Sequence, residues 1–287
     1  MIITAPGYRV KASETGVGIV LETSDLAPLT ADPAFLKDVQ GWMDRHYVLH
    51  IRAELPLTPA AIEPLAHALG MARGPYEGRR GPMKGFEFIG DFSAKGREDD
   101  GRARTPAFIE SLHYDTYGKQ PEAYAFSHTR LVPKGAPQLF VDMRAVYREL
   151  PADLKSLITG RNALQGRMPL PSQPLSAAPQ FEREKASIRP LVLAHWRTGE
   201  PLLFLPKHPD SLVEGLEDAE GRDLLHDLWN RTHHSSHRYT SPMRSNDLVI
   251  WDNIGVTHTN PAYDRGSDRT VWFFTVPSPH SLRAYAA

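Results

Sequence analysis

The sequence contains no cysteine among its 287 residues. This absence excludes disulfide frameworks, thiolate zinc sites, iron–sulfur clusters and cysteine nucleophiles, so any metal must be held by His, Asp or Glu. The chain also has no apolar run that approaches the ~20 residues needed to cross a bilayer, and its first residues do not read as a signal peptide. We therefore expect a cytoplasmic protein with no membrane partner.

An excess of charge of one sign is missing as well. The 33 basic and 34 acidic residues leave a formal net charge of −1, which argues against the broad basic surface that nucleic acid requires. There is no Walker loop, no Gly-x-Gly-x-x-Gly fingerprint and no Gly-x-Ser-x-Gly elbow, so nucleotide-hydrolase, Rossmann and serine-hydrolase functions have no supporting motif. We expect a small-molecule substrate and a single domain over residues 1–287.

The residue pattern predicts an α+β protein with a mainly β core. Two helices begin at an N-cap followed by proline, at Asp32-Pro33 and Thr58-Pro59, and they end near His46 and Gly70. A third helix carries Leu224, Leu225, Leu228 and Trp229 on its buried face. Short apolar runs predict strands at residues 47–52, 123–132, 138–142, 191–195, 202–205, 247–252 and 270–276.

Two long stretches lack a regular pattern. Residues 93–106 are polar and strongly charged, and residues 168–190 are rich in proline. Loops of this length often cover a site, so we expect both to act as lids that exclude water from it.

The most informative short segment contains His113 and Asp115. In an extended chain, residues two apart point to the same side, so these two side chains would present an imidazole and a carboxylate to one point. This is a geometry that can hold a metal. A surface strand with an ion pair has the same pattern and remains an alternative at this point.

A second segment could complete such a site. A buried strand, residues 247–252, leads through a turn to His258, and Arg269 follows eleven residues later. Two histidines and one carboxylate leave three positions open on a metal, as in non-haem Fe(II) oxygenases. A planar guanidinium at Arg269 suits the distal carboxylate of 2-oxoglutarate. Taken singly, His258 could be a strand end and Arg269 a surface charge.

Four segments, in order along the chain, resemble the taurine and chlorophenoxyacetate dioxygenases, a family that depends on Fe(II) and 2-oxoglutarate. His113-Tyr114-Asp115 is similar to the family's His-x-Asp pair. Residues 135–147 resemble a Gly-Gly-Asp-Thr segment followed by a strand and Asp-Met-Arg, and residues 190–204 resemble Pro-Leu-Val-x-x-His-x-x-Thr-Gly. Residues 247–269 match the final motif, spacing included.

The resemblance implies a double-stranded β-helix, or jelly roll, flanked by helices. It implies that His113, Asp115 and His258 bind Fe(II), that Arg269 binds the far carboxylate of 2-oxoglutarate, and that O2 is the oxidant. Gln138 stands where the family commonly has Thr, and it could still donate a hydrogen bond to that carboxylate. A homo-oligomer is also implied.

Phe273 is the most informative departure from the family pattern. It stands four residues after Arg269, where taurine-type members carry an arginine that meets the sulfonate. Because phenylalanine cannot bind an anion, we do not expect taurine as the substrate. Four aromatic side chains near the motifs are candidates for a substrate pocket: Tyr114, Tyr117, Trp251 and Phe273. Core packing is the alternative for Tyr114, Tyr117 and Trp251.

The predicted reaction is hydroxylation of an unactivated C–H bond of a small organic molecule, with release of succinate and CO2. Desaturation or cyclisation of a biosynthetic intermediate would use the same cofactors and is an alternative. A further alternative is a jelly-roll protein that has lost catalysis and only binds a ligand. Because Asp115 is present as a ligand, a halogenase of the type that replaces the carboxylate by a small residue is disfavoured.

Overall fold

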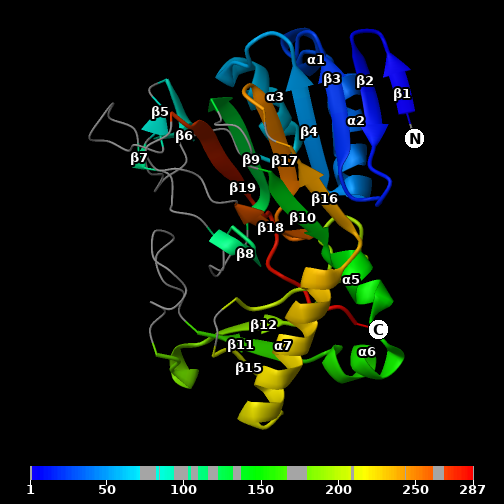
Figure 1. Cartoon of the computed structure of the whole chain (residues 1–287), viewed down its shortest axis with the longest axis vertical. Coiled ribbons are helices and arrows are strands. Elements are labelled where there is room, and N and C mark those ends of the chain that lie inside the picture. The colour runs from blue at the N-terminus through cyan, green and yellow to red at the C-terminus, as the bar shows by residue number, and fades with distance from the viewer. Residues whose placement is uncertain are drawn as a thin grey trace.

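The computed structural model describes residues 2–71, 82–83, 85–93, 103–104, 109–115, 122–131, 137–166, 180–207, 210–242, 244–260 and 268–286. Within these ranges the chain forms a mixed α/β structure around a large β-sheet core (Figure 1). No helix among these residues is long and apolar enough to cross a membrane. Most of the two predicted lids lies outside the described residues, and so does Tyr117.

The largest sheet has ten strands in the order β1-β2-β3-β4-β17-β9-β19-β6-β5, with β7 paired to β6. All its neighbours are antiparallel except the pairs β3/β4 and β6/β7. The strands are β1 (Ile2–Ala5), β2 (Tyr8–Ala12), β3 (Ile19–Thr23), β4 (Val48–Ala53), β5 (Pro82–Met83), β6 (Phe86–Ser93), β7 (Ala103–Arg104), β9 (Glu122–Leu131), β17 (Asp247–Asp252) and β19 (Thr270–Pro277).

A second sheet of four strands packs against one face of the large sheet. Its order is β16-β10-β18-β8, with bounds Arg238–Ser241, Gln138–Asp142, Val256–Asn260 and Ile109–His113. A buried cluster joins the two sheets, with Val249 and Trp251 from the large sheet and Phe140, Tyr239 and Val256 from the small one. The short turn between β17 and β18 passes from one sheet to the other.

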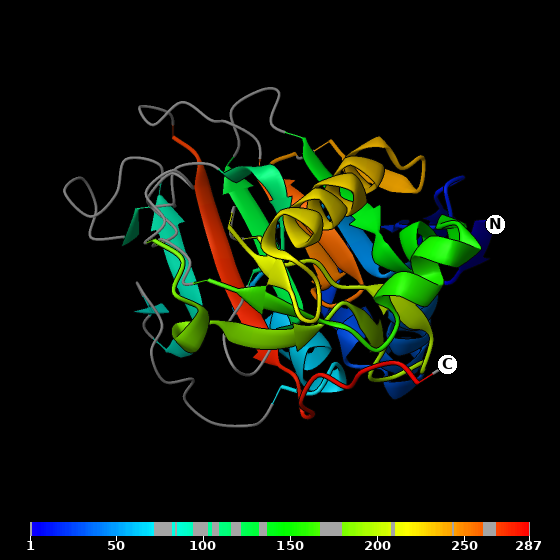
Figure 2. The same ribbon diagram turned by 90° about the horizontal axis from the view of Figure 1, so that it is seen from below.

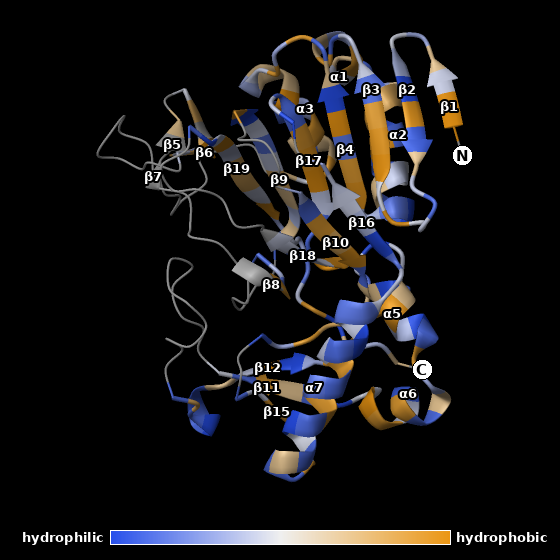
Figure 3. Ribbon diagram, in the orientation of Figure 1, coloured by the Kyte–Doolittle hydropathy of each residue, from blue (hydrophilic) through white to orange (hydrophobic). Residues whose placement is uncertain are grey.

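Helices α1 (Ala27–Thr30), α2 (Pro33–His46) and α3 (Pro59–Ala68) cover the opposite face of the large sheet. Successive residues of a strand point to opposite faces of the sheet, so alternate residues of β17 face the helices. Leu248 and Ile250 of β17 pack against the apolar stripes of these helices. Figure 3 shows the hydrophobic stretches of β3, β4 and β17 side by side in this sheet. The two predicted N-caps are confirmed, since Asp32 accepts a hydrogen bond from the Ala34 amide (2.9 Å) and Thr58 from the Ala61 amide (3.2 Å).

The described residues between 143 and 234 form a third region, seen in front when the molecule is viewed from below (Figure 2). It contains α5 (Met143–Glu149), α6 (Ala152–Ile158), β11 (Asn162–Gln165), the 3-10 turn η2 (Arg183–Lys185), β12 (Ser187–Pro190), β13 (Val192–Ala194), β14 (Pro201–Leu203), β15 (Leu212–Val213) and α7 (Asp218–His234). The prediction that residues 168–190 are wholly irregular is wrong at their end. There η2 forms, and β12 pairs with β11. The backbone hydrogen bonds of β12 come from β11, a strand distant in sequence, so the local sequence does not indicate them.

The predicted strands in the centre and C-terminal part are confirmed within one or two residues. The N-terminal strands β1 to β3 were not predicted, and they extend one side of the large sheet. Pro64 lies inside α3, and the helix begins at Pro59, as its N-cap predicts.

Candidate metal centre

His113 and His258 are brought together by the register of two neighbouring strands. His113 ends β8, His258 lies in the middle of β18, and the two residues are paired directly across the ladder. Because directly paired residues point to the same face of a sheet, both rings lie on one side. The row continues with Phe140 of β10, which is paired with His258 and lies on the face that meets the large sheet.

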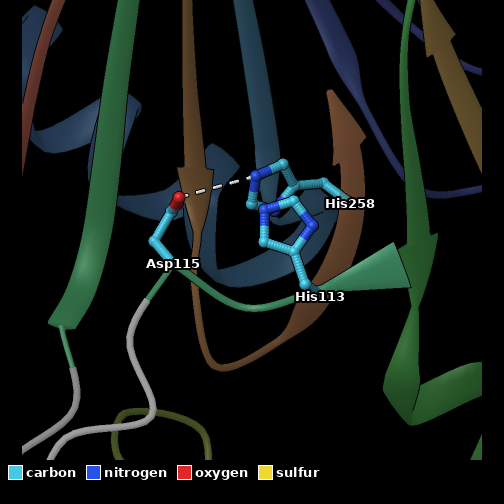
Figure 4. A group of neighbouring side chains, drawn as sticks. All are labelled: His113, Asp115 and His258. Carbon is cyan, nitrogen blue, oxygen red and sulfur yellow. Dashed lines mark ion pairs between the residues drawn. The ribbon is translucent and has the colours of Figure 1, made fainter. Parts of the chain in front are cut away.

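Asp115 follows two residues after His113 and points to the same place (Figure 4). Its Oδ1 lies 3.6 Å from Nε2 of His258, and the ring centroids of the two histidines are 4.2 Å apart. One ligand atom from each of the three residues lies within 4.8 Å of the others. Among the described residues, this is the one group of three or more potential ligands close enough to hold a metal ion.

The polar atoms of this group suit a metal ion. Both ring nitrogens of His258 and Oδ2 of Asp115 are buried and have no hydrogen-bond partner among the described residues. Buried polar atoms are nearly always paired, so three such atoms in one place call for an explanation. A divalent cation bound by two imidazoles and a carboxylate would occupy one ring nitrogen of His258 and an oxygen of Asp115, and this donor set is the one that non-haem iron uses.

Burial also sets the protonation of the group. It lowers the pKa of His258 to about 3, with a smaller contribution in the same direction from the Lys207 ammonium. The ring is therefore neutral at physiological pH and can offer a lone pair. Burial raises the pKa of Asp115 to about 7, while the Trp251 side chain and Lys207 oppose that rise. A metal ion would favour the ionised carboxylate and displace the proton.

Asn253 holds the backbone that carries Asp115. Its Oδ1 accepts a hydrogen bond from the Asp115 amide at 2.8 Å, and its Nδ2 donates to the Glu122 carbonyl at 3.3 Å. The side chain is buried, and it lies in the turn between β17 and β18. We did not predict this role from the sequence, although Asn253 belongs to the motif that ends at His258.

The neighbouring Asp252 shapes the same turn. One of its oxygens accepts hydrogen bonds from the amides of Ile254 and Gly255 (2.9 and 2.8 Å), and the other lies 2.8 Å from Nε2 of the buried His195. These contacts fix the path of the chain just before β18. They also join the His195 segment to the final motif.

Gln138 and Arg269 lie on different sheets, Gln138 at the start of β10 in the small sheet and Arg269 just before β19 in the large one. Gln138 is buried on β10, two residues before Phe140. Its side chain is therefore on the same face of the sheet as Phe140, the residue that is paired with His258. Arg269 is partly buried and directly precedes β19. The described contacts do not test a role for either residue in binding 2-oxoglutarate.

The candidate substrate residues differ in their surroundings. The ring of Trp251 lies 4.9 Å from that of His258 and 6.2 Å from that of Phe273, which is partly buried. Trp251 therefore adjoins the centre, and Phe273 lies next to Trp251. Tyr114 instead packs on Phe204 (ring centroids 4.4 Å) and donates a hydrogen bond to the Leu203 carbonyl (3.2 Å). Core packing, the alternative considered for Tyr114, accounts for its position.

Comparison with known proteins places the chain in a family. Residues 12–275 match the model of the taurine catabolism dioxygenase TauD, TfdA family. The chain is 32% identical over 246 residues to an alpha-ketoglutarate-dependent 2,4-dichlorophenoxyacetate dioxygenase of Burkholderia sp. (strain RASC), a match that covers 81% of this chain and 82% of the relative.

Two solved structures share the fold. A taurine dioxygenase from Burkholderia xenovorans superposes with a TM-score of 0.74 at 19% identity and covers 98% of this chain and 96% of its own. The protein AAD-2, in complex with Mn(II) and N-oxalylglycine, gives a TM-score of 0.71 at 21% identity and covers 96% and 98%. By its sequence, the chain belongs to the TauD/TfdA family and is an Fe(II)/2-oxoglutarate-dependent dioxygenase.

Proposed function

We propose that this enzyme hydroxylates an unactivated C–H bond of a small organic substrate other than taurine, at an iron centre held by His113, Asp115 and His258. The observation that carries the proposal is the convergence of the three side chains, whose ligand atoms lie within 4.8 Å of one another. Bound iron and 2-oxoglutarate would supply the activation of O2, with succinate and CO2 as co-products.

The residues of the chain have separate tasks in this reaction. The neutral His258 and the ionised Asp115 bind the metal, and Asn253 keeps the Asp115 backbone in place. Arg269 binds the distal carboxylate of 2-oxoglutarate through its planar guanidinium, and Gln138 donates a hydrogen bond to the same group. Trp251 and Phe273 form an apolar wall that excludes water from the reacting C–H bond.

The substrate class follows from the relatives and from Phe273. The relatives' names include 2,4-dichlorophenoxyacetate and (S)-phenoxypropionate dioxygenases, so aryloxy acids are the first compounds to assay. Phe273 offers no charge for a sulfonate. Analysis of the organic product separates hydroxylation from desaturation and cyclisation, which need the same cofactors.

We also propose that the two packed sheets form the double-stranded β-helix expected for this family. The face-to-face packing of the large and small sheets supports this architecture. A homo-oligomer and a cytoplasmic location remain predictions of the sequence, and sedimentation of the purified protein would test the first.

The test is an anaerobic titration of the metal-free protein with Fe(II) and then 2-oxoglutarate, followed by the weak visible charge-transfer band of the complex. We expect the band in the wild type, its loss in His113→Ala and a weaker band at equal 2-oxoglutarate in Arg269→Ala. His234→Ala, on the exposed end of α7, is the matched control. A folded wild-type protein without the band would contradict the proposal.

A further inference from the structure

His195 belongs to a motif of the sequence to which the proposed reaction gives no task. It lies in the turn between β13 and β14, and its ring reaches Asp252 at the end of β17, with 2.8 Å between Nε2 and Oδ2. Neither side chain exposes more than 1% of its surface. A polar pair buried this deeply fixes two segments relative to each other, because both groups lose their partner if either segment moves.

The turn that carries His195 also places the proton of its ring. The Thr198 amide donates a hydrogen bond to Nδ1 (3.3 Å). A backbone amide can only donate, so Nδ1 accepts, and the ring proton is on Nε2, which donates it to Asp252. Gly199 closes the turn at a φ of 73°, with a hydrogen bond from its amide to the His195 carbonyl (2.8 Å). The His-x-x-Thr-Gly motif therefore serves to present an N–H group to Asp252.

Asp252 carries this contact on to the metal centre. Its other oxygen, Oδ1, accepts hydrogen bonds from two amides of the turn formed by residues 252–255 (2.9 and 2.8 Å). This turn leads directly into β18, whose third residue is His258. Asn253 of the same turn accepts a hydrogen bond from the Asp115 amide (2.8 Å). One turn therefore acts on two of the three candidate ligands, and the Asp252 carboxylate holds it.

We propose that His195 is a positioning residue of the metal centre: through Asp252 it holds the turn 252–255 in the conformation that brings His258 and Asp115 together. This inference rests on the proposed function, because it assumes that these ligands bind iron. It also gives the third region a task, since β13 and β14 belong to that region and their apolar side chains pack in its interior. The metal centre then depends on the docking of a region that supplies none of the three ligands.

A similar buried pair at the other end of β17 provides a matched control. His50 of β4 has its Nε2 2.7 Å from Oδ2 of Asp247 and its Nδ1 2.7 Å from the Tyr239 hydroxyl. Both members of the pair are buried, and Asp247 begins β17 at the end opposite to the turn 252–255. Loss of the His50 ring should therefore cost stability in a similar way without acting on that turn.

The experiment measures Mn(II) affinity by calorimetry and stability by urea unfolding in the same set of variants. His195→Leu removes the donor, His195→Gln offers an amide N–H in its place, and His50→Leu is the control. Asp252→Asn keeps one oxygen for the two turn amides and replaces the other by an NH2 group, which cannot accept from His195. The double variant His195→Leu/Asp252→Asn tests whether the two residues act as one unit.

We expect His195→Leu and Asp252→Asn each to bind Mn(II) about tenfold more weakly than the wild type, and the double variant to bind no more weakly than either. His195→Gln should stay within about threefold of the wild type, because a donor to Asp252 is retained. His50→Leu should unfold at lower urea concentration, as His195→Leu does, yet bind Mn(II) within about twofold of the wild type. At saturating Fe(II) and 2-oxoglutarate, the anaerobic charge-transfer band should change position in His195→Leu and keep it in His50→Leu.

Three results would overturn the inference and leave the proposed function intact: wild-type Mn(II) affinity in folded His195→Leu, an equal loss of affinity in His50→Leu, or losses that add in the double variant. If His195→Leu does not fold, the comparison of Asp252→Asn with His195→Gln decides, and equal Mn(II) affinity of these two overturns the inference. A folded wild type that neither binds Mn(II) nor forms the band would contradict the proposed function itself.

Discussion

At the scale of single residues, the environment of each ligand decides whether it is ready for a metal. The imidazole of His258 is fully buried between Phe140 and Trp251, which keeps it neutral and excludes water. Asp115 lies in the same apolar surroundings, but there burial raises the pKa of its carboxyl group and makes that group harder to ionise. The two groups therefore respond differently to pH, although they lie 3.6 Å apart.

This difference predicts the pH dependence of metal binding. Burial raises the pKa of Asp115 to about 7, so below that pH a proton occupies the carboxylate that the metal needs. We expect the affinity for Mn(II), a non-oxidising probe, to be level above about pH 7.5 and to fall toward tenfold per pH unit below pH 7. The pKa of His258, lowered to about 3, adds no dependence in this range.

Calorimetric titration with Mn(II) in buffers of matched ionic strength measures this profile. Asp115→Asn, which cannot ionise at this position, should bind Mn(II) weakly and without the step near pH 7. A level wild-type affinity between about pH 5.5 and 8 would show that the carboxyl group is ionised throughout.

Asn253 acts on the centre through Asp115. Replacing it with alanine would leave the Asp115 amide without the hydrogen bond of 2.8 Å and would free the backbone that carries the ligand. Residues that orient metal ligands typically contribute 10–100-fold to affinity, so we expect Asn253→Ala to bind Mn(II) roughly tenfold more weakly. The control is Asn230→Ala on the exposed face of α7. Equal affinity in the two variants would contradict a positioning role for Asn253.

At the scale of elements, the turn between β17 and β18 links the two sheets and ends just before the strand of His258. Asp252 caps this turn through the amides of residues 254 and 255. Gly255 lies against the ring of Tyr47, which follows α2, and a Cβ at position 255 would clash with two ring carbons. The turn therefore has room for glycine but not for a larger residue.

The close approach predicts the effect of Gly255→Ala. The added methyl group must displace Tyr47 or the turn, and such overpacking typically costs about 1–3 kcal/mol of unfolding free energy. Because β18 starts at Val256, we also expect weaker Mn(II) binding. Gly41→Ala in the middle of α2 is the control, and it should be neutral or stabilising by up to about 1 kcal/mol. Urea unfolding measures both, and an unchanged midpoint in Gly255→Ala would refute the argument.

At the scale of the whole molecule, the β core and the region of residues 143–234 share contacts. Trp196 packs against both the helix-covered face of the large sheet and the apolar cluster of the third region. Arg144 of α5 donates a hydrogen bond to the Arg45 carbonyl at the end of α2 (2.9 Å), and it stacks over Tyr47 (3.7 Å). These contacts connect the two regions.

We therefore expect the chain to unfold as a single domain. Tryptophan fluorescence and far-ultraviolet circular dichroism should give coincident urea transitions with one midpoint, in the metal-free protein and with Mn(II) bound. Mn(II) should raise that midpoint in the wild type and leave it unchanged in His113→Ala, because only a folded site binds the metal. Two separate transitions would show that residues 143–234 unfold independently.

The sequence by itself determined the residue types of the centre and the local elements that carry them. His113 and Asp115 stand two residues apart in one extended segment, and His258 follows a buried strand and a turn, so each is marked by its local sequence. The role of Arg269 stays a prediction. The caps at Asp32 and Thr58 and the apolar runs of the central strands are also local signals, since a helix start or a strand depends on residues within a few positions of one another.

The tertiary structure decided which distant residues meet. The pairing of His113 with His258 and the hydrogen bond from the Asp115 amide to Asn253 join segments far apart in the chain. No local pattern encodes these contacts, because they depend on strand register and on the packing of one sheet against another. The same holds for Tyr114, which alternates away from its two ligand neighbours and packs into the core on Phe204.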